Sequence, residues 1–182
     1  MNEQILYITV GTPGCGKSFY TATNLANVPH YESDMYFMRN GTYQFKIEQL
    51  DTAHKWCQDK VRSELLAGNS CVVSNTNLTP WEMQTYFNMV REIGTNIKIE
   101  VIEFKYINTE QPDEASIFNS LHFNNYSADE KLNIYNRMKS RDNVHHRIGF
   151  YMDNKDIIKS VKLHTLYRTK DTYTAKIKEF II

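Results

Sequence analysis

Hydrophobic positions along the chain switch between short continuous runs and longer stripes spaced by three or four residues. The runs at 5–10, 70–74 and 97–104 are rich in β-branched residues and predict buried strands. Apolar residues recur at three- and four-residue steps over 47–65 and stop before Gly68, which predicts an amphipathic helix. Strands that alternate with helices predict a parallel sheet wrapped by helices, because parallel strands need crossover connections.

Capping residues mark where two further helices begin. Thr79, Pro80 and Glu82 combine an N-cap, a proline at the first helical position and a glutamate three residues after the cap, so a helix is expected from there to Gly94. The stretch 127–130 is a second capping box, which predicts a helix to about Arg141.

Two further strand signals lie near the ends of the chain. The stretch 30–33 reads as a short strand that ends at Asp34, and a loop through 39–41 follows it. Beyond residue 160, β-branched and aromatic residues surround a turn at 169–171, which predicts a final strand and a C-terminal β-hairpin.

A glycine-rich motif joins the first predicted strand to a helix expected over 19–27. It reads G-x-x-x-x-G-K-S, a phosphate-binding loop, and consists of Gly11, Thr12, Pro13, Gly14, Cys15, Gly16, Lys17 and Ser18. Its glycines let backbone N–H groups point at a phosphate, Lys17 supplies a point charge to the β- and γ-phosphate oxygens, and the Ser18 hydroxyl ligates Mg²⁺. The motif in this context predicts a nucleotide site.

Composition indicates a single domain over 1–182, with a lid at about 108–141 and a basic C-terminal segment at 142–182. A chain of 182 residues that is 41% hydrophobic can bury a sizeable core. No signal-like segment is present and the apolar runs are too short to span a bilayer, so we expect a cytoplasmic protein that makes no membrane contact. The three cysteines, which lack C-x-x-C spacing, argue against disulfides and zinc.

The net charge of zero hides an asymmetry between the two parts of the chain. Residues 1–130 carry 9 Lys or Arg against 16 Asp or Glu, a net of −7, whereas residues 131–182 carry 12 against 5, a net of +7. Two interpretations stand: the later part is an ordinary solvated surface, or it forms a basic face that holds an anionic polymer.

Polar residues follow the second and third predicted strands. Asp34 and the stretch 75–77 come directly after these strands, so the parallel sheet places them beside the phosphate-binding loop. Phosphoryl transfer to a hydroxyl often needs a carboxylate that takes the proton, and Asp34 is the candidate for this base. Its alternative role is to cap the turn after the strand. The histidines show no metal-ligand spacing.

The combination of these motifs resembles the polynucleotide-kinase branch of P-loop kinases, and within it a sub-branch of small polynucleotide-kinase-like proteins. The resemblance spans about residues 4–105 and is carried by 11–18, 33–34, 41–45, 53–56, 74–80 and 81–83. It implies a P-loop NTPase three-layer sandwich with a mainly parallel five-stranded sheet and a helical lid, with ATP and Mg²⁺ as cofactors. It also implies transfer of the γ-phosphate to the 5′-hydroxyl at a nucleic acid 5′ end.

The resemblance assigns roles to individual residues. Asp34 matches the general base, and Thr76 and Asn77 match a pair beside the active site. Together with Asn75 next to them, they are expected to contact the substrate or the phosphates. The segment 137–141 is similar to the part of the chain behind the lid, so that Arg137 and Arg141 are expected to reach the phosphates.

Two departures from the family pattern leave the activity open. Members usually carry an aspartate at one of the positions of Ser74 and Asn75, and an amide or hydroxyl there adds no negative charge to the magnesium shell. Relatives also carry arginines where this chain has 123–125, so Arg137, Arg141 or Arg147 would have to substitute. Three hypotheses follow: a polynucleotide 5′-hydroxyl kinase, a kinase of a nucleoside, nucleotide-sugar or other small-molecule acceptor, and a non-catalytic ATP-binding module.

Overall fold

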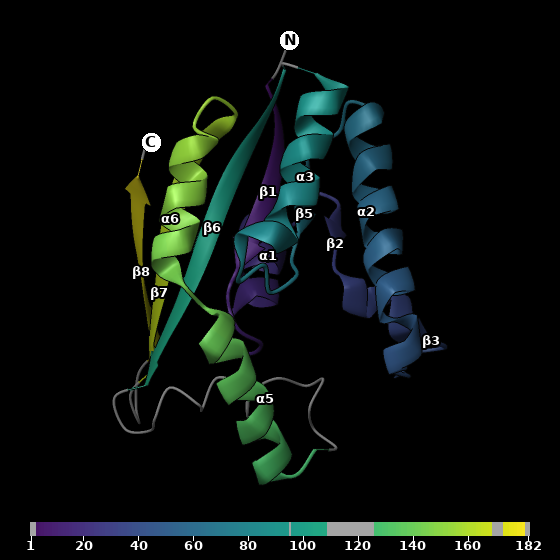
Figure 1. The fold of residues 1–182 in the computed structure, drawn as a ribbon, viewed down its shortest axis with the longest axis vertical. Helices are drawn as coiled ribbons and strands as arrows, with labels where there is room; N and C mark the ends of the chain where they lie inside the picture. Colours follow the sequence, from purple (N-terminus) through teal and green to yellow (C-terminus); the bar gives the residue numbers. More distant parts are fainter. Residues whose placement is uncertain (1–2, 95, 109–125, 169–172, 181–182) are drawn as a thin grey trace.

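A six-stranded sheet forms the centre of the computed structural model, which describes residues 3–94, 96–108, 126–168 and 173–180 (Figure 1). The strand order is β2-β5-β1-β6-β7-β8, in which the first five strands are parallel and β8 is antiparallel to β7. The strands are β1 (Gln4–Val10), β2 (His30–Tyr31), β5 (Cys71–Val73), β6 (Ile97–Asn108), β7 (Ile158–Arg168) and β8 (Tyr173–Phe180).

Helices cover both faces of this sheet and make three layers. In Figure 1, α2 (Leu50–Leu66), α3 (Pro80–Ile93) and α6 (Val144–Asp153) lie in front of the sheet, and α1 (Lys17–Asn24) lies behind it. The right-handed rule for parallel crossovers explains this division. The chain moves from β1 towards one edge of the sheet and from β5 towards the other, so the connecting helices fall on opposite faces.

The two faces of the sheet differ in how much apolar surface they bury. In front, alternate residues of β1 such as Leu6 and Ile8 pack with Phe87 of α3 and Tyr151 of α6 in the larger core cluster. Behind, a smaller cluster contains Tyr20 of α1, with Cys15, Ile102 and Phe104. The core therefore fixes β1 from both sides, directly below the phosphate-binding loop.

The described strands and helices confirm the predicted α/β class and the C-terminal antiparallel pair. Helix α3 carries the predicted capping box, and the helix expected after Ser127 is α5 (Ala128–Arg141), which Ser127 caps through the Glu130 amide. The rest of the predicted lid, 109–125, lies outside the described residues. Among the residues that are described, no helix is both long and apolar enough to cross a bilayer.

Three elements were missed by the sequence pattern. Helix α6 was not predicted, and the loop expected at 39–41 is a hairpin of β3 (Met38–Arg39) and β4 (Thr42–Tyr43). Its turn holds Asn40 and Gly41 at positive φ, which is the Asn-Gly signal for a tight hairpin. Two 3₁₀ turns, η1 (Ser33–Phe37) and η2 (Ile47–Gln49), lead into and out of this region.

Candidate active site

The phosphate-binding loop begins at a glycine that no other residue can replace. A Cβ on Gly11 would lie 2.7 Å from Cys15 Sγ and 3.1 Å from Phe104 Cβ, and its φ is +156°. Gly16 caps α1 at φ +98°, in the left-handed region that favours glycine. The loop therefore packs tightly on the end of β1 and leaves the first turn of α1 facing outward.

Lys17 lies folded against its own loop. Its Nζ donates hydrogen bonds to the backbone oxygens of Gly11, at 2.8 Å, and Thr12, at 2.9 Å, and the residue is buried. The ammonium group is thus held on the loop that would carry the phosphates. The Cys15 thiol beside it is also buried; burial raises its pKa, the Lys17 charge opposes this only in part, and the thiol stays a neutral filler.

Asp34 lies in the turn η1 at the end of β2, half-buried, where the Tyr43 hydroxyl donates a hydrogen bond of 2.9 Å to its Oδ1. Burial, and then the charge and hydrogen bond of Asp34, raise the pKa of Tyr43. The phenol therefore stays protonated near neutral pH and donates to the carboxylate. The β3–β4 hairpin that carries Tyr43 thus fixes the orientation of Asp34.

The residues after β5 join the Asp34 turn to the phosphate-binding loop. Asn75 Oδ1 accepts a hydrogen bond of 2.8 Å from the Ser33 amide, directly before Asp34. The Thr76 oxygen accepts one of 2.9 Å from the Gly11 amide, and Asn77 Nδ2 donates one of 2.9 Å to the Thr9 oxygen. We call the segment 74–77 the brace, because its hydrogen bonds hold the two halves of the candidate site in one frame.

The brace changes how the residues predicted as substrate contacts are understood. The Asn75 and Asn77 side chains bond the protein itself, and Asn77 is buried at positive φ. Ser74, one of the two positions at which the family pattern predicts an acid, is buried and accepts a 3.1 Å hydrogen bond from Thr9 Oγ1. A charge at Ser74 would have to be buried beside β1, so this chain has no position for an acidic magnesium-shell residue there.

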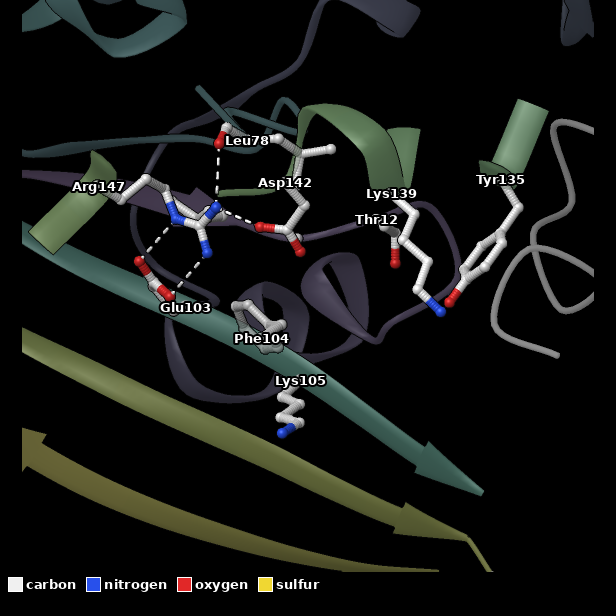
Figure 2. Close-up of a pocket in the computed structure, with 11 residues that line it drawn as sticks. Thr12, Leu78, Glu103, Phe104, Lys105, Tyr135, Lys139, Asp142 and Arg147 are labelled. Carbon is white, nitrogen blue, oxygen red and sulfur yellow. Dashed lines mark hydrogen bonds and ion pairs between the residues drawn. The ribbon is translucent and has the colours of Figure 1, made fainter. Parts of the chain in front are cut away.

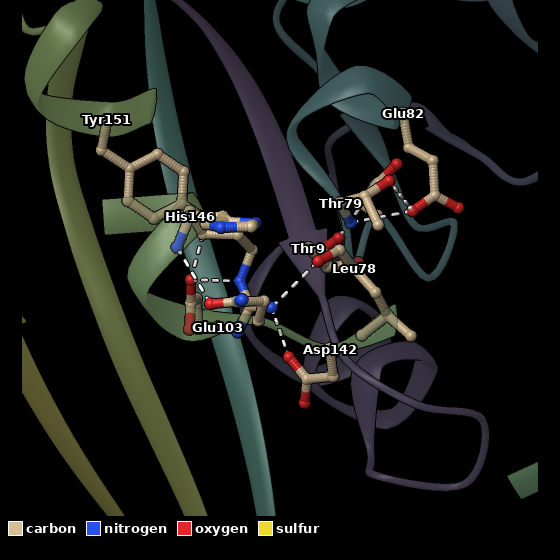
Figure 3. Close-up of polar contacts among 11 residues, drawn as sticks. Thr9, Leu78, Thr79, Glu82, Glu103, Asp142, His146 and Tyr151 are labelled. Atoms are coloured by element: carbon tan, nitrogen blue, oxygen red, sulfur yellow. Dashed lines mark hydrogen bonds and ion pairs between the residues drawn. The ribbon is translucent and has the colours of Figure 1, made fainter. Parts of the chain in front are cut away.

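Arg147 of α6 ties the opposite side of the site together (Figure 2), where the Glu103 and Asp142 carboxylates lie (Figure 3). Its guanidinium donates to both oxygens of Glu103, at 2.9 and 3.2 Å, to the Leu78 oxygen at 3.0 Å, and to Asp142. Tyr151 donates to the same Glu103 carboxylate at 2.7 Å. Burial alone would lower the pKa of Arg147, but its bonds to Glu103 and Asp142 outweigh burial and raise it.

This network corrects one expectation from the sequence. Arg147 was considered as a substitute for the missing lid arginines, yet it is 4% exposed and bonded to Glu103 and Asp142. A guanidinium whose donors already meet two carboxylates has little capacity left for a phosphate. Arg147 instead anchors the base of α5, because Asp142 ends that helix.

A small pocket of about 150 Å³ opens between the phosphate-binding loop, the end of β6 and α5 (Figure 2). Gly11 and Thr12 form one wall, and Tyr135 and Lys139 of α5 form another. Figure 2 shows Lys139 extending towards Tyr135 and Thr12, and its Nζ lies 5.5 Å from the Tyr135 ring centroid. An exposed cation on α5 thus faces the phosphate-binding loop.

The two arginines predicted to reach the phosphates lie on other faces of α5. Residues four apart share one face of a helix, whereas residues two apart do not, so Tyr135 and Lys139 point one way and Arg137 and Arg141 another. Arg141 pairs with Glu82 at 3.0 Å and lies 6.0 Å from the Trp81 ring centroid, on the side of α3. Arg137 is exposed.

The histidines in the described part of the chain hold no metal site. His54 Nδ1 lies 2.9 Å from the Ser33 hydroxyl, and His145 and His146 are exposed. The described residues contain no group of three His, Cys, Asp or Glu that could hold a metal ion. The Ser18 hydroxyl is exposed at the first turn of α1, so it fits a magnesium ion held mainly by phosphate oxygens and water.

Sequence reasoning missed several residues of the site: Tyr43, Glu103, Tyr135, Lys139 and Asp142. Tyr43 could have been predicted from the sequence, because the Asn-Gly turn at 40–41 indicates the hairpin that brings Tyr43 back to Asp34. Lys139 lies in the segment 137–141, for which the resemblance named only the arginines. Helical periodicity alone would have shown that Lys139 faces a different side of the helix from Arg137 and Arg141. The partner of Arg147 could not be read from the sequence, since Glu103 is far away along the chain.

A phosphate-binding loop follows the central strand β1 of the parallel sheet, and the Asp34 carboxylate follows β2, on the far side of β5. This arrangement defines a P-loop fold of the kinase-like phosphotransferase class. The chain belongs to the AAA_33 family, described as AAA domain, which it matches over residues 6–106.

Individual proteins with similar sequence or structure extend this comparison. The chain is 37% identical over 86 residues to human NEDD4-binding protein 2; the match covers 45% of this chain and 5% of that protein. The structure of an AvrRxo1-ORF1:ORF2 complex with ATP covers 95% of this chain and 57% of that chain, with a TM-score of 0.59 and 12% identity. A structure from the PezAT toxin–antitoxin system of Streptococcus pneumoniae covers 91% of this chain and 68% of that chain, with a TM-score of 0.55 and 13% identity. Both structures share the fold.

Proposed function

We propose that the protein transfers the γ-phosphate of ATP to the 5′-hydroxyl of a polynucleotide, with Asp34 as the general base. The observation that carries this proposal is the brace. Its hydrogen bonds fix the Asp34 turn through Asn75 and the phosphate-binding loop through Thr76. A base and a phosphate site in one rigid frame are what in-line transfer to a hydroxyl requires.

The phosphate-binding loop holds the donor in this proposal. Lys17 exchanges its bonds to the Gly11 and Thr12 oxygens for the β- and γ-phosphate oxygens, while the outward first turn of α1 offers its N–H groups. Ser18 would supply one oxygen to Mg²⁺, which when bound would provide positive charge beside the phosphates. ATP agrees with the family, and ATP is named in one of the structures that share the fold. Mg²⁺ is part of the proposal.

Asp34 handles the proton. Its carboxylate accepts the proton of the attacking hydroxyl as the oxygen–phosphorus bond forms, and the bond between the γ-phosphate and ADP breaks. Tyr43 keeps the carboxylate oriented through the bond to Oδ1. The motifs that this chain shares with polynucleotide kinases support a polynucleotide acceptor over a small molecule.

The test offers γ-labelled ATP with Mg²⁺ and a panel of 5′-hydroxyl oligodeoxynucleotides, oligoribonucleotides, free nucleosides and nucleotide-sugars. We expect label on the oligonucleotides. Asp34→Asn should lower transfer by about 10²- to 10⁴-fold at unchanged ATP affinity, whereas Lys17→Ala should lower ATP affinity itself.

Other outcomes separate the alternatives. Label on monomers alone would replace the polynucleotide with a small-molecule acceptor. Tight ATP binding with no acceptor labelled at any Mg²⁺ concentration would establish a nucleotide-binding module without transfer.

A further inference from the structure

A shallow groove of about 720 Å³ runs along the outer face of α2. Its walls are helix positions from Asp51 to Ser63, and Tyr36 of η1 closes one side. The twelve helical steps from Asp51 to Ser63, at about 1.5 Å each, make the groove about 18 Å long. In Figure 1, this helix stands at the edge of the molecule beside β2 and β3, away from the pocket in Figure 2.

Two aromatic rings line the groove and are held in place from below. The Tyr36 and Trp56 ring centroids lie 6.2 Å apart, and Tyr31 supports Trp56 edge-on at 6.4 Å. Trp56 also packs against the main core cluster, so the indole is half-buried and its position is fixed. Rings fixed before a ligand arrives lose little conformational entropy on binding.

Two cations lie over these rings. Arg39 Cζ is 5.4 Å from the Tyr36 ring centroid, and Lys60 Nζ is 6.0 Å from that of Trp56. The other lysine of the groove, Lys55, is paired with Asp59 at 3.0 Å. The remaining acid, Asp51, lies in the first turn of α2, where the helix dipole stabilises it. The groove thus presents two aromatic rings with a cation over each, while the two lysines and two aspartates of its lining balance in charge.

One wall of the groove comes from the turn that carries the candidate base. Tyr36 lies in the same 3₁₀ turn as Asp34, two residues further along the chain. Aromatic rings flanked by cations are the surface that binds single-stranded nucleic acid, because bases stack on the rings and phosphates meet the charges. We propose that this groove binds the nucleotides of the acceptor strand that follow the phosphorylated 5′ end. The inference rests on the proposed function for the class of acceptor.

The C-terminal basic segment is less suited to this task. Three of its cations are paired with acids from the first part of the chain: Arg147 with Glu103, Lys162 with Glu100 and Lys159 with Glu3. Because these cations are already paired, they leave less positive charge for a basic face than the composition indicated. In the groove on α2, by contrast, cations lie over aromatic rings.

Tryptophan fluorescence tests the proposal directly, because the chain has only two tryptophans. Trp81 is 70% exposed on α3, so Trp81→Phe leaves Trp56 as the single indole in a chain that keeps its core. Titration with 5′-hydroxyl oligonucleotides from a dinucleotide to an octanucleotide should quench Trp56, with affinity that rises with length and falls with salt.

Matched variants identify the groove. Tyr36→Leu in the Trp81→Phe background should weaken oligonucleotide binding about tenfold, whereas Tyr36→Phe keeps the ring and should change it less than about twofold. In kinase assays, Tyr36→Leu should raise KM for the octanucleotide and leave kcat and the KM for ATP unchanged. Circular dichroism confirms that each variant is folded.

The outcomes separate this inference from the proposed function. One outcome would overturn only the role of the groove: Tyr36→Leu phosphorylates oligonucleotides with an unchanged KM, and oligonucleotides do not quench Trp56. The proposed kinase activity would then still stand. Failure to label or bind any oligonucleotide, with nucleosides labelled instead, would overturn both. Quenching by a proline-rich peptide but by no oligonucleotide would assign the groove to a protein partner and overturn the proposal.

Discussion

Lys139 and Arg141 lie two positions apart on α5 but face different parts of the molecule. Lys139 lines the pocket beside Thr12, and Arg141 is bound to Glu82 of α3. Sequence similarity pointed to the arginines, because it registers residue types in a segment and not the direction in which each side chain leaves the helix. At this scale the structure favours a lysine as the cation that α5 contributes to the phosphates.

We therefore expect Lys139→Gln to lower kcat/KM for ATP about tenfold, because a charge-assisted hydrogen bond to a phosphate is lost. Arg141→Gln, the matched control on the same helix, should change kcat/KM less than about twofold. Steady-state kinetics at saturating acceptor measures both. A larger loss for Arg141→Gln than for Lys139→Gln would contradict this assignment.

At the scale of elements, the site depends on contacts that hold helices to the sheet. Arg147 joins α6 to Asp142, which ends α5, to Glu103 in β6 and to the segment after β5. Behind the sheet, His164 of β7 packs against Tyr20 of α1 at 5.0 Å and Phe104 of β6 at 5.1 Å. These two contacts set where α5 and the phosphate-binding loop lie.

Removal of Arg147 should destabilise the fold strongly. Arg147→Met leaves the largely buried Glu103 carboxylate without its cation, and we expect the free energy of unfolding to fall by about 3–5 kcal/mol. Glu103→Gln combined with Arg147→Met should recover part of this loss. Urea denaturation measures the change in the free energy of unfolding. The control is Lys55→Gln, which removes an exposed ion pair and should lower this free energy by less than about 1 kcal/mol. Equal losses of unfolding free energy for Arg147→Met and Lys55→Gln would show that burial does not make the Arg147 pair more important than an exposed pair.

Buried histidines predict lower stability in mild acid. Both ring nitrogens of His164 are buried without a hydrogen-bond partner among the described residues, as is Nε2 of His30, and burial lowers the pKa of each. An unfolded histidine titrates near about 6.5, so below that pH the unfolded chain takes up protons that the folded chain does not. Stability should be constant above about pH 6.5 and fall as the pH drops towards the lowered folded pKa.

The measurement is the free energy of unfolding in urea between about pH 7.5 and about pH 5.5. His164→Phe should make the decline shallower, with His30 responsible for the remainder. His145→Gln, at an exposed position, should leave the profile unchanged. A profile that His164→Phe does not alter would show that His164 is not protonated on unfolding in this range.

At the scale of the whole molecule, the two oppositely charged parts of the chain are joined. Ion pairs from the last 52 residues to the first 130 connect β7 and α6 to β6 and the N-terminal region. Strand β7 is also the parallel partner of β6, with Ile158 and Val161 in the main core cluster. The basic segment is therefore part of the sheet and not an appended arm.

Deletion of residues 155–182 should consequently unfold the protein. It removes β7 and β8, exposes the edge of β6 and deletes part of the core. Thermal unfolding followed by circular dichroism checks this. Lys155→Gln with Lys178→Gln, which removes exposed charge but no strand, is the control and should leave the melting temperature within a few degrees. A folded truncated protein would show that the segment is dispensable.

The sequence by itself determined the alternation of strands and helices, the phosphate-binding loop, the capped starts of α3 and α5, and Asp34 at the end of a strand. These follow from local rules, since periodicity, capping and glycine at positive φ are properties of neighbouring residues. It did not determine α6, whose apolar positions make no distinctive stripe, or the brace, in which amides and hydroxyls bond partners far away in the sequence. Only the tertiary structure decided that Arg147 is an anchor, that Lys139 and not Arg141 faces the phosphate-binding loop, and that Tyr36 and Trp56 share a groove. The physical reason is that such pairings depend on how helices and strands are oriented relative to one another, and long-range packing sets those orientations.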